Sequence, residues 1–103
     1  MYRLIYAEEA GRDLQAIFDY IAADSRNRAV EYLGKIERAI LQLQEFPNIG
    51  HESRYPEMRT LGIKVLPFED YLAFYTVNMK SQTVNIVRVL HGSVDYLSLI
   101  HIS

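Results

Sequence analysis

The chain has 103 residues, of which half are hydrophobic and 23% are charged. This length and composition are typical of a small globular protein, so we expect residues 1–103 to form a single domain. The chain has no cysteine, which excludes disulfides and thiolate metal sites. No apolar stretch approaches the roughly 20 residues of a membrane span, so we expect a cytoplasmic protein.

The charge balance limits what the chain can bind without specific contacts. Its 11 basic and 13 acidic residues give a net charge of −2. Non-specific binding to nucleic acid depends on an excess of Lys and Arg that neutralises phosphates. Any contact with nucleic acid therefore needs a local basic patch.

A short strand and two amphipathic helices make up the first half of the chain. Residues 2–6 form a strand-length, mainly apolar run with Tyr2, Leu4 and Tyr6 on one face, which predicts a strand. Apolar residues then repeat at helical spacing over residues 8–23 and again over residues 26–46. Ser25 offers a cap for the second helix and Pro47 ends it. The short link between the helices predicts an antiparallel hairpin that covers a sheet.

The second half of the chain is rich in strand-forming residues. A loop over residues 47–56 leads to a strand predicted over residues 59–66, which Pro67 ends. Glu69 and Asp70 turn the chain into two more strands, over residues 71–77 and 83–90. The order β-α-α-β-β-β predicts an α+β fold, with the N-terminal helical hairpin packed on one face of a mostly antiparallel four-stranded sheet.

The C-terminal end is unusually apolar. Chain ends are commonly polar and loosely held, so an apolar end is expected to pack on something. It packs either on the core of the chain itself or on a partner, and the sequence leaves both open. The apolar residues are Val94, Tyr96, Leu97, Leu99, Ile100 and Ile102.

Five segments, in order, carry a resemblance to one family. They are the first strand running into Ala7-Glu8-Glu9-Ala10 and Asp13-Leu14, the segment Ile17-Phe18-Asp19-Tyr20-Ile21, the segment Leu43-Gln44-Glu45-Phe46-Pro47-Asn48-Ile49-Gly50, the segment Tyr71-Leu72-Ala73-Phe74-Tyr75, and the segment Val87-Arg88-Val89-Leu90-His91-Gly92 followed by Asp95. With these segments the chain resembles the RelE/ParE superfamily of type II toxin–antitoxin toxins, and its ParE-like branch most of all.

The resemblance implies a growth-inhibiting toxin, of the kind used in plasmid stabilization, that a cognate antitoxin neutralises in a hetero-oligomer. ParE-like relatives inhibit DNA gyrase without a known hydrolytic site, and RelE-like relatives cut mRNA on the ribosome. Our hypothesis is a non-enzymatic toxin that binds a macromolecular target such as DNA gyrase. The alternatives are a ribosome-dependent, metal-independent mRNA endoribonuclease and a catalytically inactive binding module. No cofactor and no membrane partner are expected.

Two residues depart from the pattern of the family that the chain resembles. Many members have Ser or Thr where this chain has Ala7, so the first helix lacks a side-chain cap. Many have Arg where this chain has Leu72, and in the nuclease branch that Arg acts on the phosphate. Leu72 therefore argues against the nuclease alternative.

Cationic side chains supply the candidate site residues. A metal-free nuclease needs a base, an acid and cations, for which Arg59, Arg88 and His91 are the catalytic candidates. The candidates for target binding are Arg54, Arg59, Lys64 and Arg88. On a regular strand Arg88 shares a face with Val84, Ile86 and Leu90, whereas His91 shares a face with Val87 and Val89. Arg88 and His91 then point to opposite faces, unless a bulge or the end of the strand redirects His91.

Each candidate also has a purely structural explanation. Arg88 is better suited to tie a carboxylate such as Asp95 or Glu69, and His91 is better suited to form a hydrogen bond at the end of its strand. Lys64 alternates with apolar residues and would then lie in solvent, as would Arg59.

Neither of the two remaining histidines suggests a metal centre. His51 lies in the predicted loop and His101 in the C-terminal tail, without the spacing of metal ligands. We therefore expect no metal site.

Overall fold

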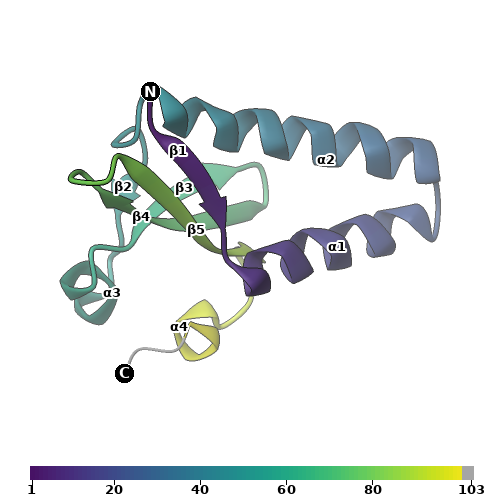
Figure 1. Ribbon diagram of the computed structural model, residues 1–103. Coiled ribbons are helices and arrows are strands. Elements are labelled where there is room, and N and C mark those ends of the chain that lie inside the picture. Colours follow the sequence, from purple (N-terminus) through teal and green to yellow (C-terminus); the bar gives the residue numbers. More distant parts are fainter. Residues whose placement is uncertain (101–103) are drawn as a thin grey trace.

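The chain folds into one mixed sheet with helices on both faces, as the computed structural model shows for residues 1–100 (Figure 1). The elements are β1 (Arg3–Tyr6), α1 (Glu8–Ala22), α2 (Arg26–Leu41), the 3-10 turn η1 (Gln42–Gln44), β2 (His51–Glu52), α3 (Pro56–Thr60), β3 (Lys64–Phe68), β4 (Tyr71–Asn78), β5 (Thr83–His91) and α4 (Tyr96–Leu99). The strand order is β1-β5-β4-β3-β2, with β1 parallel to β5 and the other neighbours antiparallel. The predicted α+β class is confirmed, although the sheet has five strands rather than four.

The helical hairpin forms as the sequence predicts, except that α2 ends at Leu41, before the predicted residue 46, and the 3-10 turn η1 follows it. The side chain of Ser25 accepts a hydrogen bond from the Arg28 amide (3.2 Å) and so caps α2. Ala7 precedes α1 without a side-chain cap, and Glu8 and Glu9 occupy the first turn, where the helix dipole favours negative charge. Neither helix, nor any other helix of the described residues, is long and apolar enough to cross a membrane.

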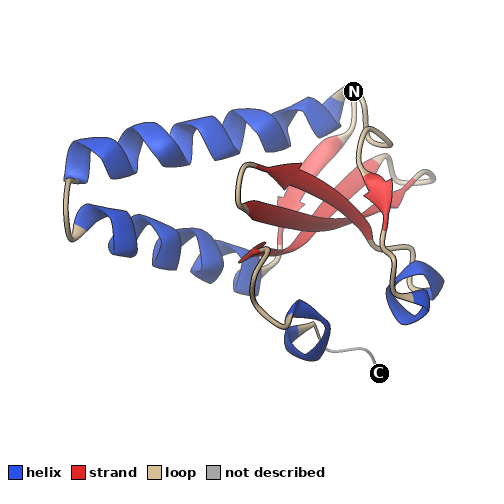
Figure 2. Ribbon diagram, turned by 180° about the vertical axis from the view of Figure 1, so that it is seen from behind, coloured by secondary structure: helices blue, strands red, loops and turns tan. Residues whose placement is uncertain are grey.

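The sheet separates two apolar cores. On one face, α1 and α2 pack against β1, β4 and β5, with Ile36, Ile40, Tyr75 and Ile86 among the most buried residues. On the other face, α3 and α4 cover a smaller core that includes Met58 and Phe74. Figure 2 shows the sheet between the long hairpin and the two short helices.

The region before β3 differs from its prediction. Residues 56–60 form the short helix α3 rather than the beginning of a strand, because Pro56 suits the first turn of a helix. Strand β3 then runs through Pro67 instead of ending there. Since β2 pairs only with Lys64 and Val65, Pro67 lies where no neighbouring strand needs an amide hydrogen.

The C-terminal segment packs on the chain itself as far as the structure describes it. Tyr96, Leu97 and Ile100 pack into the smaller core, and the Tyr96 ring lies 4.9 Å from that of Phe74. Val94 and Leu99 remain exposed. The predicted apolar residue Ile102 lies outside the described residues.

A bulge at Val87 changes the two faces of β5. Tyr75 pairs with Ile86, whereas its neighbour Phe74 pairs with Arg88, so Val87 is the extra residue. The prediction that Val89 shares a face with Val87 is therefore wrong: Val89 lies in the core under the hairpin, together with Ile86. Leu90 likewise joins the core under α3 and α4 rather than the face of Ile86.

Arg88 ties three segments together at the edge of β5. Its Nε and Nη2 atoms donate to the two carboxylate oxygens of Asp13 in α1 (2.8 and 2.9 Å), and Nη1 donates to the Leu99 carbonyl (3.0 Å). Asp13 also accepts the Val89 amide (2.9 Å). The predicted partners Asp95 and Glu69 do not take this role, because the chain fold brings α1 instead to the end of β5. We call this arrangement the Asp13–Arg88 clasp.

A close approach at Gly50 fixes the loop that leads to β2. The Gly50 amide donates to the hydroxyl of the fully buried Tyr75 (3.0 Å). A β-carbon at Gly50 would lie 2.5 Å from that hydroxyl and 2.6 Å from the carbonyl oxygen of Val65. Only glycine therefore allows the loop to lie this close to the sheet.

Replacing Gly50 by Ala should destabilise the protein, because the backbone carbonyl of Val65 cannot move aside cheaply. We expect Gly50→Ala to lower the free energy of unfolding by ~1–3 kcal/mol in denaturant titrations followed by circular dichroism. Gly11→Ala is the matched control, since a β-carbon at Gly11 in α1 meets nothing within 4 Å. It should stabilise the helix by up to ~1 kcal/mol, and equal effects of the two changes would contradict the packing at Gly50.

Removing the charge of Asp13 should open the clasp. The side chains of Arg88 and Asp13 are only 19% and 12% exposed, so Asp13→Asn leaves a mostly buried guanidinium without its anion. We expect a loss of ~1–3 kcal/mol in unfolding free energy. The control is Glu8→Gln, which breaks the exposed pair of Glu8 with Arg12 and should cost at most ~0.5 kcal/mol. A similar small loss for both variants would show that the clasp contributes little.

Candidate functional site

An open groove lies beside the smaller core, where β2, β4 and α4 meet. Its volume is about 440 Å³. Its lining comes from five places in the sequence: His51, Glu52, Ser53, Arg54, Val65, Leu72, Gly92 and Tyr96. The floor is apolar at Val65 and Leu72, and the polar groups lie on the segment that follows Gly50. The groove is therefore suited to bind a surface that is partly apolar.

Arg54 gives this groove its positive charge. Its guanidinium lies 5.1 Å from the centre of the Tyr55 ring and donates to the Tyr55 hydroxyl (3.1 Å). This hydrogen bond raises the pKa of Arg54, so the side chain remains a cation. The Tyr55 and Tyr96 rings meet edge-on at 5.7 Å. An exposed guanidinium on an aromatic support can bind a carboxylate, a phosphate or a flat ring.

Arg59 holds the groove wall rather than lining it. Its Nη1 atom donates to the carbonyl of Ser53 (2.9 Å). The Ser53 side chain, in a residue only 4% exposed, accepts the Tyr55 amide (3.1 Å) and contacts the sulfur of Met58 (3.4 Å). Arg59 and Ser53 thus fix the turn from β2 into α3.

Lys64 belongs to the opposite face of the sheet from the groove. Val65 and Ile63 lie in the smaller core, so the intervening Lys64 points toward the side of the helical hairpin. It is half-buried, and it pairs across the strands with Glu52 and Tyr75. The expectation of a fully solvated Lys64 is therefore not met.

His91 lies at the end of β5, on the face of the helical hairpin. Its ring meets the Tyr71 ring edge-on at 5.3 Å. Its Nδ1 atom accepts the Ser93 amide (3.0 Å) and lies 2.7 Å from the Ser93 hydroxyl. Both contacts lie within the turn that follows β5, so Ser93 orients the ring.

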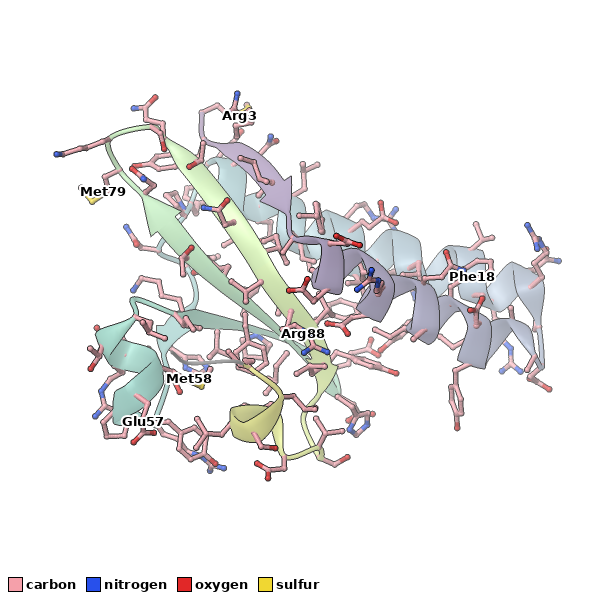
Figure 3. All side chains as sticks on the ribbon, turned by 60° about the horizontal axis from the view of Figure 1, so that its bottom comes forward. Arg3, Phe18, Glu57, Met58, Met79 and Arg88 are labelled. Carbon is pink, nitrogen blue, oxygen red and sulfur yellow. The ribbon has the colours of Figure 1, made fainter. Side chains whose placement is uncertain are left out.

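The structure does not assemble the three catalytic candidates. Arg88 lies on the same face of the sheet as Phe74, its cross-strand neighbour. Its side chain bends around the edge of β5 to Asp13, and Figure 3 shows Arg88 next to α1. His91 lies on the other face, in register with Tyr71. In the described part of the chain, no hydrogen bond or ion pair joins any two of Arg59, Arg88 and His91. Of the predicted cations, only Arg54 lines the groove.

Sequence reasoning missed the roles of Asp13 and Tyr96. Asp13 lies between Ala10 and Leu14 on the apolar face of α1, and a carboxylate at such a position needs a cation. That signal predicts a partner but not its identity, because Arg88 lies 75 positions away. Tyr96 gave no signal of its own beyond the apolar character of the tail.

A second, larger groove lies between the two long helices near the tip of the hairpin. Its volume is about 680 Å³, and Figure 1 shows the hairpin extending well beyond the sheet at this end. Its lining residues are Tyr20, Ile21, Ala23, Asp24, Arg28, Glu31, Tyr32 and Lys35. Tyr20 is 80% exposed. An exposed aromatic side chain beside mixed charges is typical of a surface that binds a protein.

Tyr32 forms the inner wall of this second groove. Its ring meets the rings of Phe68 and Tyr71 edge-on at 5.9 and 6.1 Å. Burial raises the pKa of Tyr32 to about 12, and the nearby Glu69 carboxylate adds to the rise. Tyr32 therefore stays neutral at physiological pH and holds α2 to the turn between β3 and β4.

The described residues contain no arrangement that suits a metal ion. No group of three or more His, Asp or Glu side chains converges anywhere in residues 1–100.

Comparison with solved structures shows which proteins share this fold. A chain of the chromosomal ParDE toxin–antitoxin system from P. aeruginosa has a TM-score of 0.71 and 25% identity, over 88% of this chain and 96% of that one. The RelBE2 toxin–antitoxin complex from Mycobacterium tuberculosis gives 0.62 and 24%, over 87% and 96%. The intact E. coli RelBE complex gives 0.64 and 14%, over 91% and 100%.

Comparison by sequence is more specific about the family. A search of curated proteins gives no match. The family model described as the ParE toxin of type II toxin–antitoxin systems, parDE, matches residues 4–96, which is nearly the whole chain and includes both grooves and the pair of Asp13 with Arg88. The chain therefore belongs to the ParE toxin family of type II toxin–antitoxin systems.

Proposed function

We propose that this toxin inhibits growth by binding a macromolecular target, such as DNA gyrase, through the groove around Arg54, and that it does so without cleaving RNA. The observation that carries the proposal is the state of Arg88, whose guanidinium is engaged by Asp13 and by the Leu99 carbonyl. A cation that is paired in this way is not free to stabilise the transition state of phosphodiester cleavage.

The lining of the groove supports binding over catalysis. Leu72 and Val65 form its floor, where a nuclease needs groups that move protons or hold a phosphate. His91 lies on the other face of the sheet, and its Nδ1 atom accepts the Ser93 amide. Arg54, Tyr55 and Tyr96 instead form the combination of guanidinium and aromatic rings that is common at the centre of protein interfaces.

Arg54→Ala should weaken growth inhibition, because it removes the one cation that lines the described groove while leaving the fold intact. Loss of a charged contact corresponds to about a 10- to 100-fold weaker affinity for the target. The measurement is growth after graded induction of the toxin without its antitoxin. Arg12→Ala is the matched control: Arg12 is an exposed arginine of α1, paired with Glu8, and its loss should not change toxicity.

The nature of the target is tested with the purified toxin in two reactions. Inhibition of DNA supercoiling by gyrase, with mRNA left intact on translating ribosomes, is the expected result. Cleavage of ribosome-bound mRNA would overturn the proposal in favour of the nuclease alternative. Normal growth during full induction would also overturn it and would favour an inactive binding module.

We also infer that a cognate antitoxin neutralises this toxin and that it uses the groove at the tip of the hairpin. The fold is shared with chains whose solved structures are toxin–antitoxin complexes. Arg28 and Lys35 place positive charge at the groove, and Asp24 and Glu31 form i,i+4 pairs with them. Tyr20 and Ile21 add the apolar contact.

Tyr20→Ala should therefore weaken binding of the antitoxin without changing toxicity. An exposed tyrosine at the centre of an interface typically contributes ~1–3 kcal/mol, so we expect the dissociation constant to rise about 5- to 100-fold in calorimetric titrations. Val30→Ala is the control. Val30 lies on α2 and is exposed, as Tyr20 is on α1, but it does not line the groove. An unchanged affinity for Tyr20→Ala would place the antitoxin elsewhere.

A further inference from the structure

The outer edge of β1 is a feature that the proposed function does not use. The amides of Arg3 and Ala7 donate to the carbonyls of Gln82 and Ile86 (2.9 Å each), which fixes the side of β1 that faces β5. Because these groups alternate along a strand, the N–H and C=O groups of Leu4 and Tyr6 point away from the sheet. Within residues 1–100, no hydrogen bond to these outward groups is found.

No helix or strand of residues 1–100 covers this edge (Figure 1). Figure 1 views the molecule from the β1 side, and no other element lies in front of the strand. The unpaired part of this edge begins after Tyr2, because the Tyr2 amide donates to the Gln44 carbonyl (2.8 Å). Unpaired strand edges readily pair with another strand unless short length, charges, proline or a bulge prevent it. Strand β1 (Arg3–Tyr6) is short and carries one charge, at Arg3, but it has no proline and no bulge.

We propose that the β1 edge pairs with the β1 edge of a second copy of this chain, antiparallel, around a two-fold axis that passes beside Ile5. In this register Leu4 lies opposite Tyr6 of the second copy, and Tyr6 lies opposite Leu4 of the second copy. Each copy supplies two donors and two acceptors at the spacing that the other copy needs, which gives four main-chain hydrogen bonds. The two sheets then form one continuous sheet of ten strands, because each copy contributes five.

The exposed side chain of Ile5 fits this arrangement. Ile5 is 39% exposed and lies on the face of the sheet away from the hairpin. At the two-fold axis it would face Ile5 of the second copy in a non-hydrogen-bonded pair, where side chains approach most closely. Pairs of β-branched residues at such positions stabilise antiparallel sheets. The pairing thus covers an apolar side chain that the isolated chain leaves in solvent.

The charges around β1 favour a second copy in the antiparallel direction. Arg3 begins the strand, and Glu8 and Glu9 follow it directly in α1. In an antiparallel dimer, Arg3 of each copy lies near Glu8 and Glu9 of the other copy. A parallel copy would instead place like charges together. Arg3 forms no ion pair within the described residues, so its charge is available for this contact.

A cysteine scan tests the register directly, because the chain has no cysteine of its own. In the full chain, Ile5→Cys should form a disulfide-linked dimer on mild oxidation, since paired α-carbons at the axis lie within the roughly 4.4–6.8 Å that a disulfide spans. Arg3→Cys is the matched control on the same strand and face. The α-carbons of position 3 in the two copies would lie about 13 Å apart in this register, so this variant should remain unlinked.

Sedimentation velocity over a range of concentrations tests the dimer without a cross-link. The unmodified chain should show a reversible monomer–dimer equilibrium, and Ile5→Lys should raise its dissociation constant at least about tenfold by placing two like charges at the axis. Val30→Lys, at an exposed position of α2, should leave the equilibrium unchanged. Circular dichroism establishes that each variant is folded.

Three outcomes would overturn the proposal. The first is a strictly monomeric chain at hundreds of micromolar. The second is equal cross-linking of Ile5→Cys and Arg3→Cys. The third is protection of the Leu4 and Tyr6 amides from hydrogen exchange only when an antitoxin peptide is added, which would assign the edge to that partner. None of these results depends on whether the groove around Arg54 binds gyrase, so the two proposals fail separately.

Discussion

The Asp13–Arg88 clasp is the interaction on which the arrangement of the two cores depends. Arg88 approaches from the face covered by α3 and α4, whereas Asp13 belongs to a helix on the other face. A bidentate pair between them, reinforced by the Val89 amide, joins the two sides of the sheet at the end of β5 that β1 does not cover. The third donor of Arg88 fixes the segment that carries Tyr96 and Ile100 into the smaller core. Most of the guanidinium is thereby satisfied within the chain.

The bulge at Val87 is what makes the clasp geometrically available. Without the extra residue, Val89 would leave the core under the hairpin and Arg88 would enter it. With the bulge, Val89 remains buried among apolar residues, and Arg88 lies beside Phe74 near the free end of the strand. From there its long side chain reaches around the edge to α1. A local irregularity of one residue thus decides which face carries a charge.

Periodicity predicted the elements well where a repeat extends over several turns or strand residues. The two helices, the cap at Ser25 and the pair β4 and β5 follow directly from the pattern of apolar residues. The pattern failed where a single residue decides the outcome: α3 depends on Pro56, and the faces of β5 depend on the bulge. The candidate site was less predictable still. Arg54 was identified, but the Tyr96 ring that meets the adjacent Tyr55 comes from a distant segment that only the folded chain brings there.

The pairing of Arg88 bears on the chemistry that the fold can support. For Arg88 to hold a scissile phosphate, it must first leave Asp13 and the Leu99 carbonyl, and Asp13 would remain as an unpaired carboxylate in a mostly buried position. That cost, of several kcal/mol, would have to be recovered from the contacts of a bound RNA. Arg54 needs no such rearrangement, since it is exposed and already oriented by Tyr55. The proposal of recognition through Arg54 rather than catalysis through Arg88 therefore rests on the same ion pair that stabilises the fold.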